Sequence, residues 1–314
     1  MTLLNPRVDI AFKKIFGTEE NKDLLISFIN SIVSEEDQVT DIELLNPYNS
    51  RNFVGDKQSI LDIKAKDLLG NYYNIEVQIC DEGDYTERAL LYWAKLYADQ
   101  LRTGDPFSKL RRAIAIHVLN FTSIPNTPDY YNKFYVSNAK TGLRFFDHLE
   151  IHTIELNKFT PKVDEPLSLM LPRIKNGLDR WATFLTKAPS LDRNNLPKEL
   201  VDPFIKKALD VLTNTFLNDE ERELYEGHLK WLRIEASALE KAEKKAEARG
   251  KAEGKAEGKA EGRSEGKAEG RAEGRAQGKA EGKVEMARDL LNLGFPISAI
   301  SKASGLSEED IKAL

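Results

Sequence analysis

A glycine-punctuated repeat in the C-terminal third of the chain places the firmest limit on what it can fold into. From Gly250 to Gly282, glycine recurs at every fourth position, nine times, mostly within units of the form (Lys/Arg)-Ala-Glu-Gly. Four residues advance an α-helix by about 400°, so each residue type moves about 40° around the helix per repeat. No apolar stripe persists, and the repeat encodes neither a hydrophobic core nor a conventional coiled-coil seam. The rest of the chain must therefore supply the globular part of the protein.

The repeat divides the chain into three predicted parts. Residues 1–239 form a large domain, residues 240–283 a spacer, and residues 284–314 a small helical hairpin of helix-turn-helix type. Alanine, glutamate and lysine favour helix, whereas each glycine costs about 1 kcal/mol relative to alanine, so the spacer is either helical or flexible. As an alternative to a simple spacer, the small residues of the repeat could let two copies of the chain approach closely. We therefore expect a homo-oligomer that forms through the repeat. Acidic residues begin the last helix and oppose binding of DNA phosphates there, so a protein-interaction cap is an equally good interpretation of the hairpin.

Composition and charge narrow the class of protein. The single cysteine, Cys80, permits no internal disulfide, and 41% hydrophobic residues are enough for a core. The N-terminus lacks the features of a signal peptide, and no apolar run approaches the ~18 residues needed to span a bilayer. We therefore expect a cytoplasmic protein without a membrane partner. Residues 1–239 hold 30 basic and 36 acidic side chains, a balance that argues against tight non-specific binding of nucleic acid but not against catalysis.

Residues 58–80, which read QSILDIKAKDLLGNYYNIEVQIC, predict a β-hairpin. Gly70 can adopt a positive φ at the end of a three-residue loop, and that loop pairs Asp67 with Asn71 and, further back, Asp62 with Glu76. Side chains two apart on a strand share a face. The polar face then carries Asp62, Lys64, Glu76 and Gln78, and Val77 points to the opposite face.

Two carboxylates converge on this polar face. Directly paired residues have Cβ atoms ~5 Å apart, and like charges at that distance are destabilising unless a cation lies between them. Mg²⁺ is a suitable cation because it takes oxygen ligands from one or two carboxylates and completes its shell with water and phosphate. From the spacing alone, a surface hairpin with two solvated acids is an equally good interpretation.

Flanking residues give the hairpin a family resemblance. The spacing Asp62-x13-Glu76-x-Gln78 resembles the Asp…(Asp/Glu)-x-Lys core of the PD-(D/E)XK nucleases. The run Ile75-Glu76-Val77-Gln78 is similar to the IExQ strand of the recombination-promoting nuclease (Rpn) branch, the PD-(D/E)XK nuclease family transposases. In the first helix, D-x-x-F-K-x-x-F, which starts at Asp9, resembles the opening of the same branch. The resemblance covers about residues 4–235.

The resemblance implies an α/β fold with a restriction-endonuclease-like core, in which helices flank a central mixed sheet, and a helical C-terminal extension. The expected elements follow the core order of the superfamily: helix, three strands, helix, strand. The helices lie after Asn5-Pro6 and at 84–102, and the strands at 41–47, 58–80 and 111–121. A further β-rich stretch is expected at 143–156, with helices over 164–240 that buttress the core.

The resemblance also implies the chemistry, which is metal-dependent cleavage of DNA linked to recombination or mobile elements. Asp62, Glu76 and the Val77 carbonyl would hold Mg²⁺, with Mn²⁺ as the alternative ion, so that a polarised phosphodiester is attacked by an activated water. Gln78 replaces the lysine of the wider superfamily; it can orient water but brings no charge, and Lys64 is a candidate for the missing cation. Asp9 lies on a helix that abuts the site in the family and is a candidate assistant to metal or substrate.

Three residues are candidates for contact with nucleic acid. They are Lys13 on the first helix and Arg88 and Tyr92 on the helix after the IExQ strand. Each also has an ordinary structural explanation: an ion pair of Lys13 with Asp9, or an arginine stem packed on a tyrosine.

Two alternatives stay open. His148 and His152 lie four residues apart, but the spacing supplies no third metal ligand, so ordinary strand histidines are expected. A catalytically silent DNA-binding or scaffolding protein that retains the nuclease fold and assembles through its tail is the rival to the endonuclease hypothesis.

Overall fold

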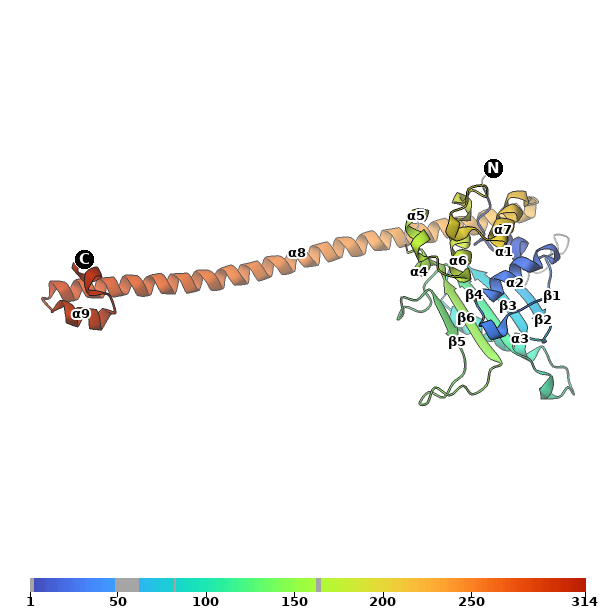
Figure 1. Ribbon diagram of the computed structural model, residues 1–314, viewed down its shortest axis with the longest axis horizontal. Coiled ribbons are helices and arrows are strands. Elements are labelled where there is room, and N and C mark those ends of the chain that lie inside the picture. The colour runs from blue at the N-terminus through green and yellow to red at the C-terminus, as the bar shows by residue number, and fades with distance from the viewer. Residues whose placement is uncertain (1–2, 49–61, 82, 162–164) are drawn as a thin grey trace. The chain divides into compact units, whose positions relative to one another are not determined.

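The computed structural model describes residues 3–48, 62–81, 83–161 and 165–314 (Figure 1). The chain forms two compact units, Met1–Ala238 and Leu239–Leu314. The predicted hairpin falls mostly within the described residues, but its first four positions, 58–61, lie outside them.

A six-stranded mixed sheet forms the centre of the first unit (Figure 1). Its order is β1-β2-β3-β4-β6-β5, where the β3–β4 and β4–β6 pairs are parallel and the others antiparallel. The strands are β1 Ile42–Leu44, β2 Ile63–Asp67, β3 Tyr72–Gln78, β4 Ala113–Leu119, β5 Tyr131–Phe134 and β6 Leu149–Glu155. A parallel pair needs a crossover connection, and the helix between β3 and β4 supplies it.

Helices cover both faces of this sheet, which confirms the predicted fold class. On one face, aliphatic side chains of β2, β3 and β4 join Phe12, Phe16, Phe28 and Trp181 in the main core. On the other face, Trp93 of α3 packs over the small side chains of β4. The helices are α1 Asp9–Phe16, α2 Lys22–Asn30, α3 Tyr85–Ala98, α4 Leu156–Phe159, α5 Leu167–Met170, α6 Gly177–Lys187, α7 Pro203–Asn214 and α8 Asp219–Asn292.

The observed order of α1, β1, β2, β3, α3 and β4 is the expected one, but the element boundaries differ from prediction by one to several residues. Pro6 lies in a turn closed by the bond from Val8 N to Asn5 O, so α1 begins only at Asp9. A short 3₁₀ turn, Glu19–Asn21, separates Thr18 from the start of α2. The edge strand β5 was not predicted, since its half-exposed residues lack a clear alternation.

The second unit contains the repeat and the C-terminal hairpin. Helix α8 continues through the repeat, and a Cβ added at any glycine from Gly250 to Gly282 would meet no described atom within 4 Å. Among the described residues, no helix is both long and apolar enough to cross a membrane.

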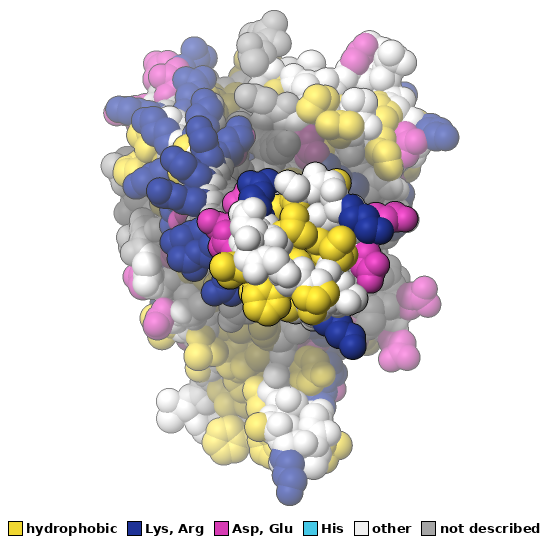
Figure 2. Space-filling view, turned by 90° about the vertical axis from the view of Figure 1, so that its left-hand side faces the viewer, with side chains coloured by type: hydrophobic (Ala, Val, Ile, Leu, Met, Phe, Trp, Pro, Cys, Tyr) yellow, Lys and Arg dark blue, Asp and Glu magenta, His cyan; other side chains and the backbone are white. Residues whose placement is uncertain are grey.

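The hairpin consists of α9 Ile297–Ser304 and α10 Glu308–Lys312, which pack with the end of α8 around Ala287, Ile300 and Ile311. Glycines with positive φ, Gly294 and Gly305, end the helices that precede them. Leu293 and Phe295 remain exposed, and Figure 2 shows hydrophobic side chains with charged ones around them at this end of the chain.

Candidate active site

The register of the β2–β3 hairpin places the two predicted carboxylates opposite each other. Gly70 has a φ of 89°, and Asp67 N donates to Asn71 O at 3.0 Å, which closes the expected loop. Ile63 then pairs with Ile75, and the next step of the same register sets Asp62 against Glu76. The turn chemistry therefore brings both carboxylates to one end of the hairpin.

Three hydrogen bonds fix the backbone on either side of the Asp62 side chain. The Asp62 carbonyl accepts from Lys13 Nζ at 2.7 Å and from Asn46 Nδ2 at 2.9 Å. Asn46 Oδ1 in turn accepts from Lys64 N at 2.7 Å. Asn46 thus continues the pairing of β1 with β2 beyond the end of β1. Asn46 lies within the predicted strand 41–47, and nothing in the sequence pattern marked its side chain as part of the site.

A third carboxylate, Asp9 at the start of α1, belongs to the same electrostatic cluster. Burial, then the charge of Glu76 and that of Asp62, raises the pKa of Asp9 to about 7. Burial also raises the pKa of Asp62 and of Glu76, and for Glu76 the charge of Asp62 adds to the effect. Glu76 and Asp62 therefore lie close enough to Asp9, and Asp62 close enough to Glu76, to disfavour ionisation of the neighbouring acid.

Two carboxylate oxygens of this cluster are left without a partner. Asp9 Oδ1 and Glu76 Oε2 are buried and have no hydrogen-bond partner among the described residues. The other oxygen of Asp9, Oδ2, lies 3.3 Å from His228 Nδ1. His228 comes from α8, more than two hundred residues further along the chain than Asp9, so no sequence spacing related the two residues. Buried anionic oxygens without donors are costly, which marks this point as a site for a cation or an ordered water.

A chain of hydrogen bonds leads from Glu76 through Gln78 to Arg88 on α3. Gln78 Nε2 donates to Glu76 Oε1 at 2.6 Å, and Arg88 NH2 donates to Gln78 Oε1 at 3.0 Å. The positive charge of Arg88 favours the ionised form of Glu76, as that of Lys64 does for Asp62. The structure thus brings several predicted residues together around one end of the hairpin. They are Asp9, Asp62, Lys64, Glu76, Gln78 and Arg88.

His117 lies beside Glu76 in the next strand. The two residues are paired between β4 and β3, with His117 Nδ1 3.8 Å from Glu76 Oε2. Neither ring nitrogen has a hydrogen-bond partner among the described residues, and burial lowers the pKa of His117 to about 4, which leaves the ring neutral. Tyr85 of α3 packs edge-on against the ring at a centroid distance of 5.6 Å. Sequence reasoning predicted the strand but not this neighbour, because the parallel register is set by tertiary packing.

The structure also gives the surroundings of three further predicted residues, Lys13, Val77 and Tyr92. Lys13 was expected to contact nucleic acid, but it is 2% exposed, and burial lowers its pKa to about 8. Its bond to the Asp62 carbonyl makes it a support for the site. The side chain of Val77 is buried in the main core, which leaves only its backbone for ligation. Tyr92 is half-buried on α3, and the structure gives it no bond to the carboxylates.

The two histidines of the predicted β-rich stretch, His148 just before β6 and His152 within it, have ordinary hydrogen-bond partners. His148 Nδ1 lies 2.8 Å from the Tyr97 hydroxyl, and His152 lies between the Tyr131 hydroxyl at 2.9 Å and Glu150 at 2.7 Å. In the part of the chain that the structure describes, no group of three or more His, Cys, Asp or Glu side chains could by itself hold a metal ion. A metal at the hairpin would therefore depend on two carboxylates together with backbone and water oxygens.

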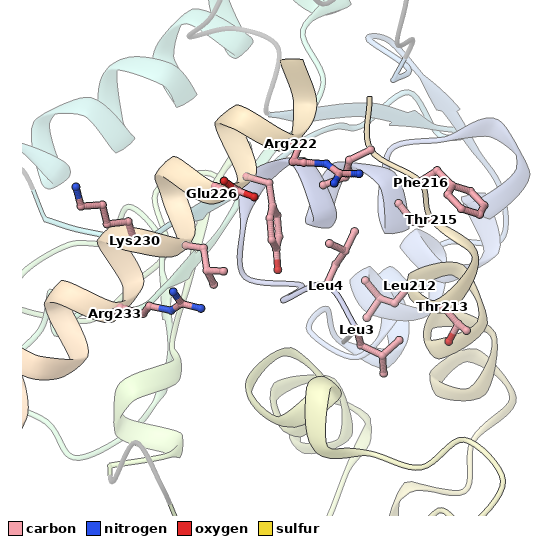
Figure 3. A pocket seen from close by; sticks show the side chains of 13 residues that line it. Leu3, Leu4, Leu212, Thr213, Thr215, Phe216, Arg222, Glu226, Lys230 and Arg233 are labelled. Carbon is pink, nitrogen blue, oxygen red and sulfur yellow. The ribbon is translucent and has the colours of Figure 1, made fainter. Parts of the chain in front are cut away.

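A groove of about 580 Å³ is formed by other residues of the first unit, from the N-terminal segment, α7 and the start of α8 (Figure 3). Leucines such as Leu4 and Leu212 line it together with Arg222, Lys230 and Arg233. None of the residues predicted for the site lines this groove, so its size does not identify it with the chemistry.

Comparison with known proteins supplies one match. A family model described as PD-(D/E)XK nuclease family transposase matches residues 6–242. No curated protein and no solved structure matches the chain.

Proposed function

The chain belongs to the PD-(D/E)XK nuclease family transposases, and from this membership we propose that it is a metal-dependent DNA endonuclease that acts in recombination or mobile-element activity. The family implies a nuclease-like function and DNA as the substrate. The observation that carries the proposal is the cluster of Asp9, Asp62 and Glu76: burial raises the pKa of each, and the charges of neighbouring carboxylates add to the effect for Asp9 and Glu76. Such perturbed acids in one place are typical of functional sites.

The donor set at the hairpin fits a hard divalent cation. The available atoms are oxygens: the carboxylates of Asp62 and Glu76 and the carbonyl of Val77. Glu76 Oε2 is buried without a donor among the described residues, and a cation would compensate its charge. One or two carboxylates completed by water suit Mg²⁺, and Mn²⁺ accepts similar ligands. When bound, such an ion supplies Lewis-acid polarisation of the phosphodiester and lowers the pKa of a water molecule.

The protein's own residues orient the reacting groups. Gln78 fixes Glu76 Oε1, so that Oε2 keeps a defined direction. Asn46 and Lys13 hold the backbone at Asp62 and thereby the position of its carboxylate. Asp9, with one oxygen near His228 and the other without a donor in the described chain, can accept a proton or a hydrogen bond from water. Lys64 stabilises ionised Asp62.

Plasmid cleavage tests the proposal. Wild-type protein is incubated with supercoiled DNA in Mg²⁺, Mn²⁺ or EDTA and compared with Asp62→Ala, Glu76→Ala and a control, Glu43→Ala, at an exposed carboxylate of β1. We expect metal-dependent nicking that is lost in the two site variants and kept in the control. Activity that persists in both site variants would remove the assignment to this hairpin. A folded but inactive wild type would instead favour the silent DNA-binding or scaffolding protein.

A further inference from the structure

Arg88 reaches the site indirectly, through a glutamine. Its NH2 group donates to Gln78 Oε1 at 3.0 Å, while Gln78 Nε2 donates to Glu76 Oε1 at 2.6 Å. The guanidinium is thus held one side chain away from a proposed metal ligand. The Arg88 side chain is 25% exposed, so it lies where a bound DNA strand can approach it.

A positively charged group such as the Arg88 guanidinium would offset the negative charge that gathers at the site during cleavage. Three carboxyl groups, Asp9, Asp62 and Glu76, are buried near one another here, and a phosphodiester adds negative charge that builds up on its oxygens in the transition state. Preorganised donors aimed at that charge are usually the largest contribution to catalysis.

Two lysines near the site, Lys13 and Lys64, already interact with Asp62. Lys13 is buried and donates to the Asp62 carbonyl. The charge of Lys64 is the main factor favouring ionised Asp62. Arg88 is partly exposed and bonded to Gln78 of the IExQ strand, and it also pairs with Asp84, a solvent-exposed carboxylate, at 3.6 Å. A surface pair of that kind contributes little and is readily exchanged for a phosphate.

We propose that Arg88 is the catalytic cation that stabilises the negative charge developing on the scissile phosphate, and that Gln78 is the positioning residue that aims it. A guanidinium carries five donors in a fixed fork, so contact with Gln78 can orient it while it pairs with phosphate oxygens. Glutamine at position 78 then serves two partners at once: its amide nitrogen holds Glu76 and its carbonyl holds Arg88. This assignment rests on the proposed endonuclease function.

The test compares Arg88→Gln with Lys95→Gln, which removes an exposed charge from the same helix. We expect Arg88→Gln to lower kcat for DNA cleavage about 100-fold. DNA affinity in Ca²⁺ and the melting temperature should stay near wild-type values, and Lys95→Gln should behave as wild type. Arg88→Lys, and Gln78→Lys introduced into Arg88→Gln, are both expected to recover at least about tenfold, because each returns a positive charge to the same place.

Several outcomes would overturn the assignment. They are wild-type kcat in Arg88→Gln, a loss explained entirely by weaker DNA binding or by unfolding, and no recovery in either lysine variant. The two hypotheses fail separately. If wild-type protein does not cleave DNA in any metal, the endonuclease function fails; if it cleaves and Arg88→Gln does too, only the role of Arg88 fails.

Discussion

Replacing Glu76 with glutamine is expected to stabilise the metal-free protein at pH 8 while removing its proposed activity. Burial and the neighbouring Asp62 raise the pKa of Glu76 from 4.5 to about 7. The folded state therefore holds this proton more tightly than the unfolded state. The stability that it contributes is fully present below pH 4.5 and is lost as the pH rises through 7.

The size of the effect follows from the same shift. Ionised Glu76 costs the folded state about 3 kcal/mol at pH 8 and about 1 kcal/mol or less at pH 5. Glutamine keeps an oxygen to accept the bond from Gln78 and carries no charge. We expect Glu76→Gln to raise the free energy of unfolding by roughly 1–3 kcal/mol at pH 8 in EDTA, and by much less at pH 5.

Glu150→Gln is the matched control, because Glu150 is a buried carboxylate in the same sheet with the opposite environment. Burial would raise its pKa, but hydrogen bonds with His152 and Lys133 outweigh burial and lower the pKa to about 2. Removing that charge should destabilise the fold at pH 8. All three tryptophans lie within Met1–Ala238, so urea denaturation followed by tryptophan fluorescence reports on this unit. Destabilisation by Glu76→Gln at pH 8, or stabilisation by Glu150→Gln, would refute the electrostatic reasoning.

Three further predictions concern the metal, the support of the site and the repeat. Because the pKa values of Asp62 and Glu76 are raised to about 6 and 7, Mg²⁺ affinity measured by calorimetry should fall roughly 100-fold from pH 8 to pH 5.5; an unchanged affinity would contradict ligation by these acids. Asn46→Ala removes the hydrogen bonds of Asn46 to Asp62 and Lys64, so it should lower the free energy of unfolding in urea by about 1–3 kcal/mol and slow DNA cleavage. Unchanged stability and activity would show that Asn46 does not support the site. Alanine at Gly266, Gly270 and Gly274 should increase helicity by circular dichroism, by about 1 kcal/mol per site, since an added Cβ meets no described atom; reduced helicity would contradict a solvated helix.

Local chemistry made the hairpin predictable. The alternation of side chains and the positive φ of Gly70 together set the register of the two strands. That register by itself places Asp62 opposite Glu76. The same period-2 pattern separated the polar face from the buried face that carries Val77. Element boundaries were less accurate, because the turn at Pro6 and the 3₁₀ segment after Thr18 depend on how the chain enters each helix.

The neighbours of the hairpin were not predictable because tertiary packing selects them. Asn46, His117 and His228 come from a strand end, the next strand and a distant helix, and no sequence spacing relates them to Glu76. The hydrogen bond from Arg88 to Gln78 had the same origin, since it depends on how α3 lies on the sheet. The sequence indicated that Gln78 lacks a positive charge, and only the fold shows a guanidinium bonded to it.

The most direct test of the carboxylate site is anomalous diffraction from crystals of the full chain soaked in Mn²⁺ at pH 8. The account predicts a peak at coordination distance, roughly 2.2 Å, from carboxylate oxygens of Asp62 and Glu76 and from the Val77 carbonyl. The peak should disappear in crystals of Glu76→Gln. A protein that cleaves DNA but binds Mn²⁺ away from this hairpin, or that keeps the same peak in Glu76→Gln, would contradict it.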